Sequence, residues 1–300
     1  MQHFLDRGQH GDWFLIPSHV INLDRHRERW LRLPELASKI GWRIARLDAV
    51  DATSMAPDEL QAAAATDPVY PLSAAEIACT MSPVLAWRTL LESDEPFLAV
   101  FEDDVEVDPL LVRLLDDTSW IPADAEVVKL ETFLQRVFVR SARSIAGTDL
   151  SLARLGSVHY GTAGYIISRS GARRLLQLSA SIDRTTDDLM FDARALWSHK
   201  LKVYQVTPAL CVQAGRRSEG AVPAFLASSI VPVRRIRSRP SLPGLILRET
   251  VRPLRQFWTF MTSTALLQIA GYRRCVVPFS LDRRDGDEQA TTMPASRRSR

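Results

Sequence analysis

Three consecutive acids, Glu102, Asp103 and Asp104, directly follow the apolar run 96–101. Side chains alternate along a strand, so if this strand continues, Glu102 and Asp104 point to one side and Asp103 to the other. Two carboxylates on one side suit a hard divalent cation such as Mg²⁺ or Mn²⁺, which also binds nucleotide phosphates. The residues alone leave a second interpretation open, in which the acids form a solvated turn that ends the strand.

Short apolar runs that alternate with helical patterns surround this motif. The helical segment 73–93 begins with S-A-A-E, a capping box, and Pro83 must either kink it or start a second helix. Buried, β-branched strands separated by helices predict a largely parallel sheet covered on both faces, with ligands at the carboxyl ends of its strands. The candidate strands lie within 14–23, 44–50, 96–101, 126–131, 159–168 and 202–210.

Composition and charge restrict the class of protein. The chain has 300 residues, 46% apolar and 24% charged, which suits one large α/β domain or two small ones and excludes a disordered or fibrous chain. Three cysteines without a C-x-x-C pair indicate a reducing compartment. The amino terminus has no unbroken apolar segment of the kind found in an export signal, and the longest uncharged stretch, 256–272, is too short and polar to span a bilayer comfortably.

The formal charge of +3 conceals two unlike parts. Residues 231–300 hold fourteen arginines and five acids, net +9, so the first 230 residues carry net −6. The basic part mixes arginine with large apolar residues, a pattern typical of attachment to an anionic membrane surface. A helix packed back on the acidic body is the alternative, and the absence of a recognised module argues against nucleic-acid binding. We expect removal of residues after about 230 to leave an active domain.

Several ordered blocks between about residues 19 and 215 resemble the family 25 glycosyltransferases, especially the bacterial lipooligosaccharide galactosyltransferases. The blocks are HVINLDRHRERW, ARLDAVD, LSAAEIACTMSPVLAWRTLL, FLAVFEDDVEVDP, VVKLETF, HYGTAGYIISRSGARRLL, TDDLMF and TPALCVQ. The resemblance implies an α/β, GT-A type (Rossmann-like) domain over residues 19–220, with a mostly parallel sheet and helices on both faces. An amino-terminal extension, 1–18, and a basic, partly amphipathic tail, 221–300, with about the last 20 residues disordered, lie outside it.

The resemblance also implies a reaction: inverting transfer of a hexose, galactose by preference, from a UDP-sugar to a saccharide or lipid-linked glycan, with Mn²⁺ or Mg²⁺. Glu102 and Asp104 are the implied metal ligands, and Asp103 contacts the donor. Asp187 is implied as the base that accepts the proton of the acceptor hydroxyl. Asp188 and Glu131 are the alternatives for that role, and a helix cap is the alternative for Asp187.

Further candidates for donor binding come from four of the blocks: Asn22, Arg25, Arg29, Asp48, Lys129, Gly161, Thr162 and Gly164. Arginine pairs bidentately with phosphate, and small residues let a substrate approach the backbone closely. The alternative for the arginines is a solvated helix face, for Lys129 with Glu131 a surface ion pair, and for the glycines an ordinary turn. His159 is interpreted as a packed or hydrogen-bonded side chain, and Trp87 as a core residue.

One position departs from the family pattern. Pro83 stands where the family usually has a histidine, so any polar role of that histidine is absent here and the acceptor preference is open. The predicted function is a transferase that makes a cell-surface glycan, as in lipopolysaccharide biosynthesis, while peripherally bound to the inner face of the cytoplasmic membrane. A metal-dependent hydrolase of sugars or nucleotides, and a non-catalytic membrane or polyanion adaptor with a lapsed transferase core, are the other classes.

Overall fold

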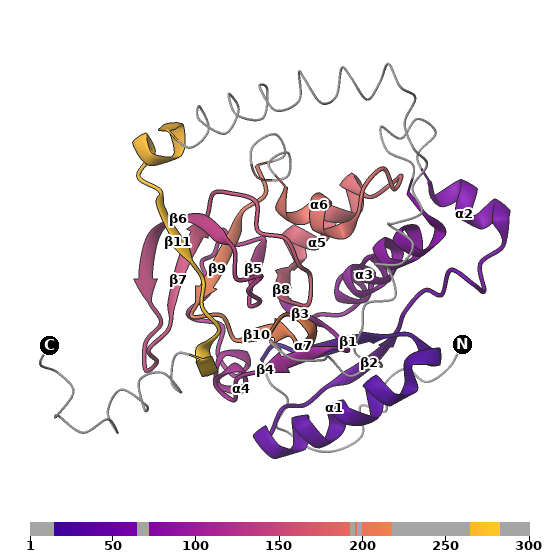
Figure 1. Cartoon of the computed structure of the whole chain (residues 1–300), viewed down its shortest axis with the longest axis horizontal. Helices are drawn as coiled ribbons and strands as arrows, with labels where there is room; N and C mark the ends of the chain where they lie inside the picture. Colours follow the sequence, from indigo (N-terminus) through magenta and orange to yellow (C-terminus); the bar gives the residue numbers. More distant parts are fainter. Residues whose placement is uncertain (1–14, 65–71, 193–195, 197–199, 218–264, 283–300) are drawn as a thin grey trace, which may run out of the picture.

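A computed structural model describes residues 15–64, 72–192, 196, 200–217 and 265–282. Within these ranges one large mixed sheet has helices on both faces (Figure 1). Its strand order is β11-β6-β7-β9-β5-β8-β3-β1-β2. The strands, in chain order, are β1 (Ser18–Asn22), β2 (Ala45–Asp48), β3 (Phe97–Glu102), β5 (Val127–Lys129), β6 (Arg136–Ser144), β7 (Ser151–Leu155), β8 (Gly164–Ser168), β9 (Val203–Thr207) and β11 (Arg273–Val276). A two-stranded ribbon pairs β4 (Val105–Val107) with β10 (Cys211–Gln213).

The sheet is less parallel than the sequence predicts. Strand β1 pairs in parallel with β2 and β3, and β5 pairs in parallel with β9. The other pairings in the described sheet are antiparallel, including those that insert β8 between β3 and β5. Because β8 runs the opposite way, its first residues lie beside the carboxyl ends of β3 and β5. This inversion brings the 159–164 block to the same edge as the acidic motif.

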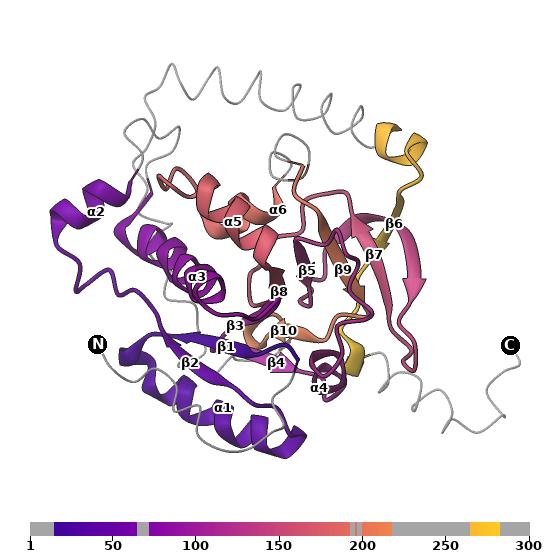
Figure 2. The same cartoon turned by 180° about the vertical axis from the view of Figure 1, so that it is seen from behind.

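Helices cover both faces of the sheet, and alternating strand residues fill the two cores. From β3, Ala99 and Phe101 join the core beneath α1 (Arg27–Ile40), and Leu98 and Val100 join the other. That second face is covered by α3 (Ala74–Glu92), α5 (Arg169–Leu178) and α6 (Thr186–Phe191), opposite α1 (Figure 2). The remaining helices are η1 (Asp24–His26), α2 (Pro57–Ala63), α4 (Leu110–Leu115) and α7 (Ala214–Arg217). No helix in the described ranges is long and apolar enough to cross a membrane.

Helix α3 begins as its sequence predicts. The backbone N–H of Glu76 donates to the Ser73 hydroxyl, and the Glu76 carboxylate accepts from the N–H of Ser73 at 2.9 Å. The helix continues through Pro83 as one element. Next to that proline, the Ser82 hydroxyl donates to the Ala78 carbonyl and accepts the Val50 N–H, which ties the helix to the loop after β2. Trp87 is fully buried, which confirms that it is a core residue.

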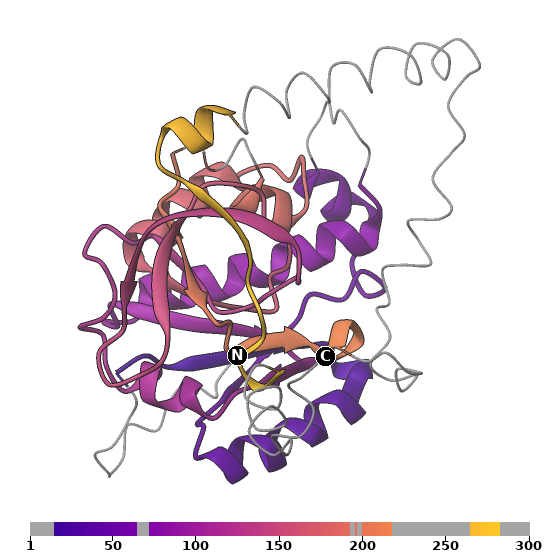
Figure 3. The ribbon, with the colours of Figure 1, turned by 60° about the vertical axis from the view of Figure 1, so that its left-hand side comes forward.

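The basic tail contributes to the domain. Residues 273–276 form β11, which pairs antiparallel with β6 and runs along the edge of the sheet (Figure 3). Just beyond it, Val277 and Phe279 are fully buried, and the backbone of Ala209 bonds to Pro278 and Ser280. The compact domain therefore extends beyond residue 220, and a cut near residue 230 would remove a strand and two buried side chains from it. The rest of the tail that was assigned to membrane attachment lies outside the described residues.

Adjacent valines at the end of β11 test this role of the tail. Val277 is fully buried, whereas 46% of Val276 is exposed. We expect Val277→Ala to lower the free energy of unfolding by about 2 kcal/mol, because it removes buried methyl groups and leaves a cavity. The matched Val276→Ala change is expected to cost less than about 0.5 kcal/mol. Urea unfolding of both variants checks this, and equal effects would contradict a structural role for the segment.

Candidate active site

The carboxyl ends of β1 and β3 bring together Asn22, Arg29 and Asp103. The Asn22 side-chain amide donates to one Asp103 oxygen at 2.7 Å, and the Arg29 guanidinium donates to the other at 3.0 Å. Arg29 is 7% exposed and Asp103 is 6% exposed, so this is a buried, hydrogen-bonded ion pair. The interpretation of Arg29 as part of a solvated helix face is wrong. Its charge compensates that of Asp103 and fixes the first turns of α1 against the acidic motif.

Glu102, the last residue of β3, lies at the centre of several acids. Its two carboxylate oxygens accept from the Thr162 hydroxyl at 2.7 Å and from the Gln213 amide at 2.9 Å. Burial, followed by the negative charges of Asp104, Glu131 and Asp187, raises the pKa of Glu102 well above its usual range. The negative charges of these neighbouring acids therefore act on one another at this place.

Asp104 lies beside Glu102, on the turn that leads into β4. Burial, reinforced by the charge of Asp103, raises the pKa of Asp104 to about 6. Its carboxylate oxygen Oδ1 is buried and has no hydrogen-bond partner among the described residues. Its backbone carbonyl accepts the N–H of Ala214 at 2.9 Å, which ties the start of α7 to the acidic motif.

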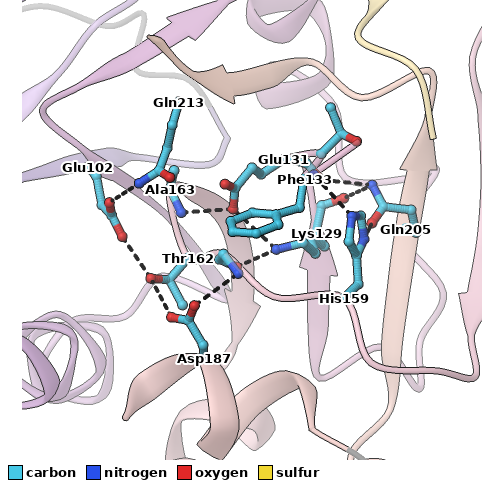
Figure 4. A network of polar contacts seen from close by, with 12 residues as sticks. Glu102, Lys129, Glu131, Phe133, His159, Thr162, Ala163, Asp187, Gln205 and Gln213 are labelled. Carbon is cyan, nitrogen blue, oxygen red and sulfur yellow. Dashed lines mark hydrogen bonds and ion pairs between the residues drawn. The ribbon is translucent and has the colours of Figure 1, made fainter. Parts of the chain in front are cut away.

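A loop of small residues, Gly161 to Ala163, separates Glu102 from Asp187 (Figure 4). The N–H of Gly161 donates to Oδ2 of Asp187 at 3.1 Å, and the Thr162 hydroxyl lies 3.4 Å from Oδ1 of Asp187. Thr162 thus stands between the acidic motif and Asp187. Asp187 is half-buried in the first turn of α6, and the residue at the cap position of that helix is Thr185. Asp187 is therefore not the helix cap, and its carboxylate faces the loop.

Beneath this loop lies a fully buried ion pair, Lys129 with Glu131. The Lys129 ammonium group is 3.2 Å from Oε2 of Glu131, donates to the Gly161 carbonyl and lies 4.2 Å from the centre of the Phe191 ring. The same Glu131 oxygen accepts the Ala163 N–H at 3.0 Å. The interpretation of Lys129 and Glu131 as a surface ion pair is wrong. The pair holds both ends of the loop that presents Gly161 and Thr162 to Asp187.

The carboxylates of Glu131 and Asp187 differ in how deeply they are buried. Burial raises the pKa of Glu131, although the Lys129 charge opposes the change, and its oxygen Oε1 has no partner among the described residues. Glu131 is fully buried behind the loop, whereas Asp187 is half-buried at its outer side. Of these two candidates for the base, Asp187 has the more accessible carboxylate.

Polar side chains behind the pair hold its strand in place. The Gln205 amide donates to the carbonyls of Lys129 and Glu131 at 3.3 and 3.2 Å, and its oxygen is 2.9 Å from Nδ1 of His159. The other ring nitrogen of His159 accepts the Phe133 N–H at 3.1 Å. Burial lowers the pKa of His159 to about 3. His159 is therefore a neutral, hydrogen-bonded core residue, as the sequence indicated.

The remaining predicted site residues lie around this network. Arg25 pairs with Asp51. Asp48 forms an exposed ion pair with Arg46 at 3.2 Å, and Arg46 donates to the Asn22 side-chain oxygen at 3.0 Å, so Asp48 is linked to Asn22 only through Arg46. Asp188 accepts from the Thr185 hydroxyl at 3.1 Å. Gly164 begins β8, and an added Cβ there would lie 2.2 Å from the Cys211 sulfur, so the position is packed against protein.

The carboxylate oxygens of Glu102 and Asp104 are of the kind that a divalent cation binds. No group of three or more His, Cys, Asp and Glu side chains within the described ranges is arranged to hold a metal. Mg²⁺, however, commonly binds one or two carboxylates and completes its shell with substrate phosphates and water. The unpartnered Asp104 oxygen and the repulsion between Asp104 and Glu102 are both relieved by a cation at this place. Glu102 and Asp104 are thus suitable ligands together with a nucleotide.

Three residues near the site were missed: Phe133, Gln213 and Arg216. Gln213 ends the matching block TPALCVQ, and Arg216 follows it by three residues. The signal that could have identified them is the position of this block after a predicted strand, at the sheet edge where ligands bind. Phe133 carries the same kind of signal, because it ends the matching block VVKLETF after another predicted strand.

Gly161 has a conformation and a neighbour that exclude other residues. Its φ is +94°, and an added Cβ would lie 2.5 Å from both carboxylate oxygens of Glu131. Gly41 also has a positive φ, +72°, but has open space around it. We expect Gly41→Ala to cost about 1 to 3 kcal/mol of stability from backbone strain alone, and Gly161→Ala to cost more. Thermal unfolding checks the difference, and equal costs would contradict the close contact between the loop and Glu131.

Comparisons with known proteins show the family of the chain. The model of "Glycosyltransferase family 25 (LPS biosynthesis protein)" matches residues 15–190. The lacto-N-neotetraose biosynthesis glycosyltransferase LgtE of Neisseria gonorrhoeae is 33% identical over 209 residues, 66% of this chain and 74% of that protein. LgtE of Neisseria meningitidis serogroup B is 37% identical, over 47% of this chain and 54% of that protein. The lipooligosaccharide biosynthesis protein lex-1 of Haemophilus influenzae is 29% identical, over 56% and 58%.

The chain thus spans between about half and three quarters of the length of these relatives. The matched region contains Asn22, the acidic motif, the buried pair, the Gly161 loop and Asp187. Arg216 and the rest of α7 lie beyond it. The family model covers more than half of the 300 residues, and the chain belongs to glycosyltransferase family 25.

Proposed function

We propose that this glycosyltransferase moves a hexose, galactose by preference, from a UDP-sugar to a saccharide or lipid-linked glycan in lipopolysaccharide or lipooligosaccharide biosynthesis. Family membership and the names of the relatives support the pathway. The observation that carries the chemistry is the placement of Asp187 and Glu102 on either side of Thr162, at the strand edge where α/β proteins bind ligands. A GT-A type fold for the domain is part of the same proposal.

The reaction is a single in-line displacement with inversion. The acceptor oxygen forms a bond to the anomeric carbon of the sugar while the bond from that carbon to the β-phosphate oxygen breaks. The electron pair of the broken bond leaves with the phosphate oxygen, and the hydroxyl proton passes to a carboxylate oxygen of Asp187. The Gly161 N–H and the Thr162 hydroxyl orient that carboxylate.

Glu102 and Asp104 would hold Mn²⁺ or Mg²⁺ together with the donor phosphates. When bound, the cation stabilises the negative charge that develops on the departing nucleoside diphosphate. Asn22 and Arg29 keep Asp103 in place beside these two ligands. The buried pair of Lys129 and Glu131 fixes the loop on the opposite side of the site.

The proposed setting is the inner face of the cytoplasmic membrane, where a lipid-linked acceptor is accessible. Support comes from the fourteen arginines of residues 231–300 and their mixture with large apolar residues. Two of them, Arg273 and Arg274, are exposed residues of β11.

A screen of UDP-sugars tests the class of reaction and the donor together. Binding of each UDP-sugar is measured by calorimetry with Mn²⁺ and with a chelator, followed by transfer to a panel of saccharides. We expect metal-dependent binding with UDP-galactose as the tightest ligand, and transfer that yields the β-linked product. Cleavage of the donor with no transfer to any saccharide would favour the hydrolase. Absence of both binding and turnover, with tight binding to anionic vesicles, would favour the adaptor.

A further inference from the structure

The short helix α7 is attached directly to the acidic motif. It follows β10, which pairs antiparallel with β4, the strand immediately after Asp104. The Gln213 side chain donates to Glu102 at 2.9 Å, and the N–H of Ala214 donates to the Asp104 carbonyl at 2.9 Å. These contacts place the backbone of α7 beside both implied metal ligands. The side chain that α7 carries at this place is Arg216.

Arg216 lies over the ring of Phe133, with its guanidinium carbon 3.2 Å from the ring centre. Phe133 is half-buried, and its ring lies in front of Lys129 and Glu131 (Figure 4). Stacking on an aromatic face holds the guanidinium plane without using any of its five N–H donors. Among the described residues no hydrogen bond or ion pair to Arg216 is present, and its contact is the stacking on Phe133. Its donors are thus available to a ligand.

The charges around Arg216 favour an anionic ligand that also binds a cation. Burial lowers the pKa of Arg216, while the charges of Glu131, Asp187 and Asp104 oppose that change, so these acids are near enough to act on it. None of them forms an ion pair with it in the described structure; Glu131 is bonded to Lys129, and Asp187 to the Gly161 loop. A diphosphate complements this arrangement, because its oxygens accept bidentate bonds from a guanidinium and also bind a divalent cation.

We propose that Arg216 binds the diphosphate of the nucleotide donor, together with the cation that Glu102 and Asp104 would hold. This inference rests on the proposed function, since it requires a nucleoside diphosphate sugar as the donor. Arg216 then also stabilises the charge on the departing diphosphate, with its plane held by Phe133. The residue lies outside residues 15–190, the part of the chain that the family model matches.

Nucleotide binding by three variants of the full chain tests the proposal. Calorimetry with Mn²⁺ present gives the affinities for UDP and for uridine, which lacks the phosphates. We expect Arg216→Met to weaken UDP binding at least tenfold and to leave uridine binding within twofold. Arg216→Lys keeps the positive charge but loses the planar, two-pronged set of N–H donors. Its UDP affinity is expected to lie between those of the wild type and Arg216→Met. Arg173→Met, which removes an exposed arginine from α5, is the matched control and is expected to bind UDP like the wild type.

The outcomes separate this inference from the proposed function. UDP affinity within twofold of wild type in Arg216→Met, or an equal loss of uridine affinity, would overturn the role of Arg216 and leave the transferase proposal standing. Tight binding of a different nucleoside diphosphate, lost in Arg216→Met, would overturn the uridine donor and support Arg216. No binding of UDP, GDP, CDP or ADP by the wild type would overturn both.

Discussion

The Asp187→Asn variant is expected to lose 10²- to 10⁴-fold in kcat for sugar transfer while it binds UDP within twofold of wild type. Asparagine has nearly the same shape as aspartate, and its side-chain oxygen still accepts the Gly161 N–H that now bonds to Oδ2 of Asp187. It cannot accept the proton of the acceptor hydroxyl. The fold and the donor site are thus kept, and the base is removed. Steady-state kinetics with the donor and acceptor identified by the screen give kcat and KM separately.

The adjacent acid provides the matched control. Asp188 lies in the same first turn of α6 but accepts from the Thr185 hydroxyl instead of facing the loop. Asp188→Asn is expected to keep at least a third of the wild-type kcat. If Asp188→Asn loses the activity and Asp187→Asn keeps more than a tenth of it, the base is Asp188. If both variants stay active and Glu131→Gln is inactive with normal stability, the base is Glu131.

Local signals in the sequence predicted much of what forms the edge of the site. The apolar run before Glu102 forms β3, and the S-A-A-E pattern caps α3 through Ser73 and Glu76. Both features depend on residues within a few positions of one another. The rule that ligands bind at the carboxyl ends of strands places Glu102 at this edge, whereas Thr162 reaches it only because β8 runs antiparallel to β3.

Contacts between distant parts of the chain could not be predicted in this way. Arg29 and Asp103 are 74 residues apart, and only the parallel pairing of β1 with β3 makes them a buried ion pair. The pattern around Lys129 and Glu131 alternates in the way a half-exposed strand does, so burial of both charges contradicted the local signal. Strand β11 was missed because four residues in an arginine-rich tail carry too little apolar pattern, although Val277 and Phe279 beside it are buried.

The buried pair of Lys129 and Glu131 gives the second large expected effect, on stability. In Lys129→Met the Glu131 carboxylate loses its opposite charge while it stays fully buried, and the Gly161 carbonyl loses a donor. Removal of one partner from a buried pair typically costs about 3 to 5 kcal/mol. We expect a loss of that size in the free energy of unfolding near pH 7, measured by urea titration.

The pH dependence of this loss distinguishes the missing charge from lost packing. Burial already raises the pKa of Glu131 above its unfolded value, and removal of Lys129 raises it further. Between the pKa of Glu131 in the unfolded state and its higher pKa in the native Lys129→Met variant, the native state binds more protons than the unfolded state. The stability of the variant therefore falls as the pH rises through that interval. The deficit relative to wild type is therefore smaller at acidic pH, where Glu131 is protonated, than at neutral pH.

The double variant Lys129→Met with Glu131→Gln completes the test. Glutamine keeps the size of Glu131 and its acceptor oxygen for the Ala163 N–H, but carries no charge and no titrating proton. We expect the double variant to recover at least half of the stability lost in Lys129→Met and to lose the extra pH dependence. An equal deficit in both variants at every pH would show that lost packing and the lost Gly161 contact, rather than an unpaired Glu131 charge, account for the effect. In that case the pair would support the loop through its hydrogen bonds alone.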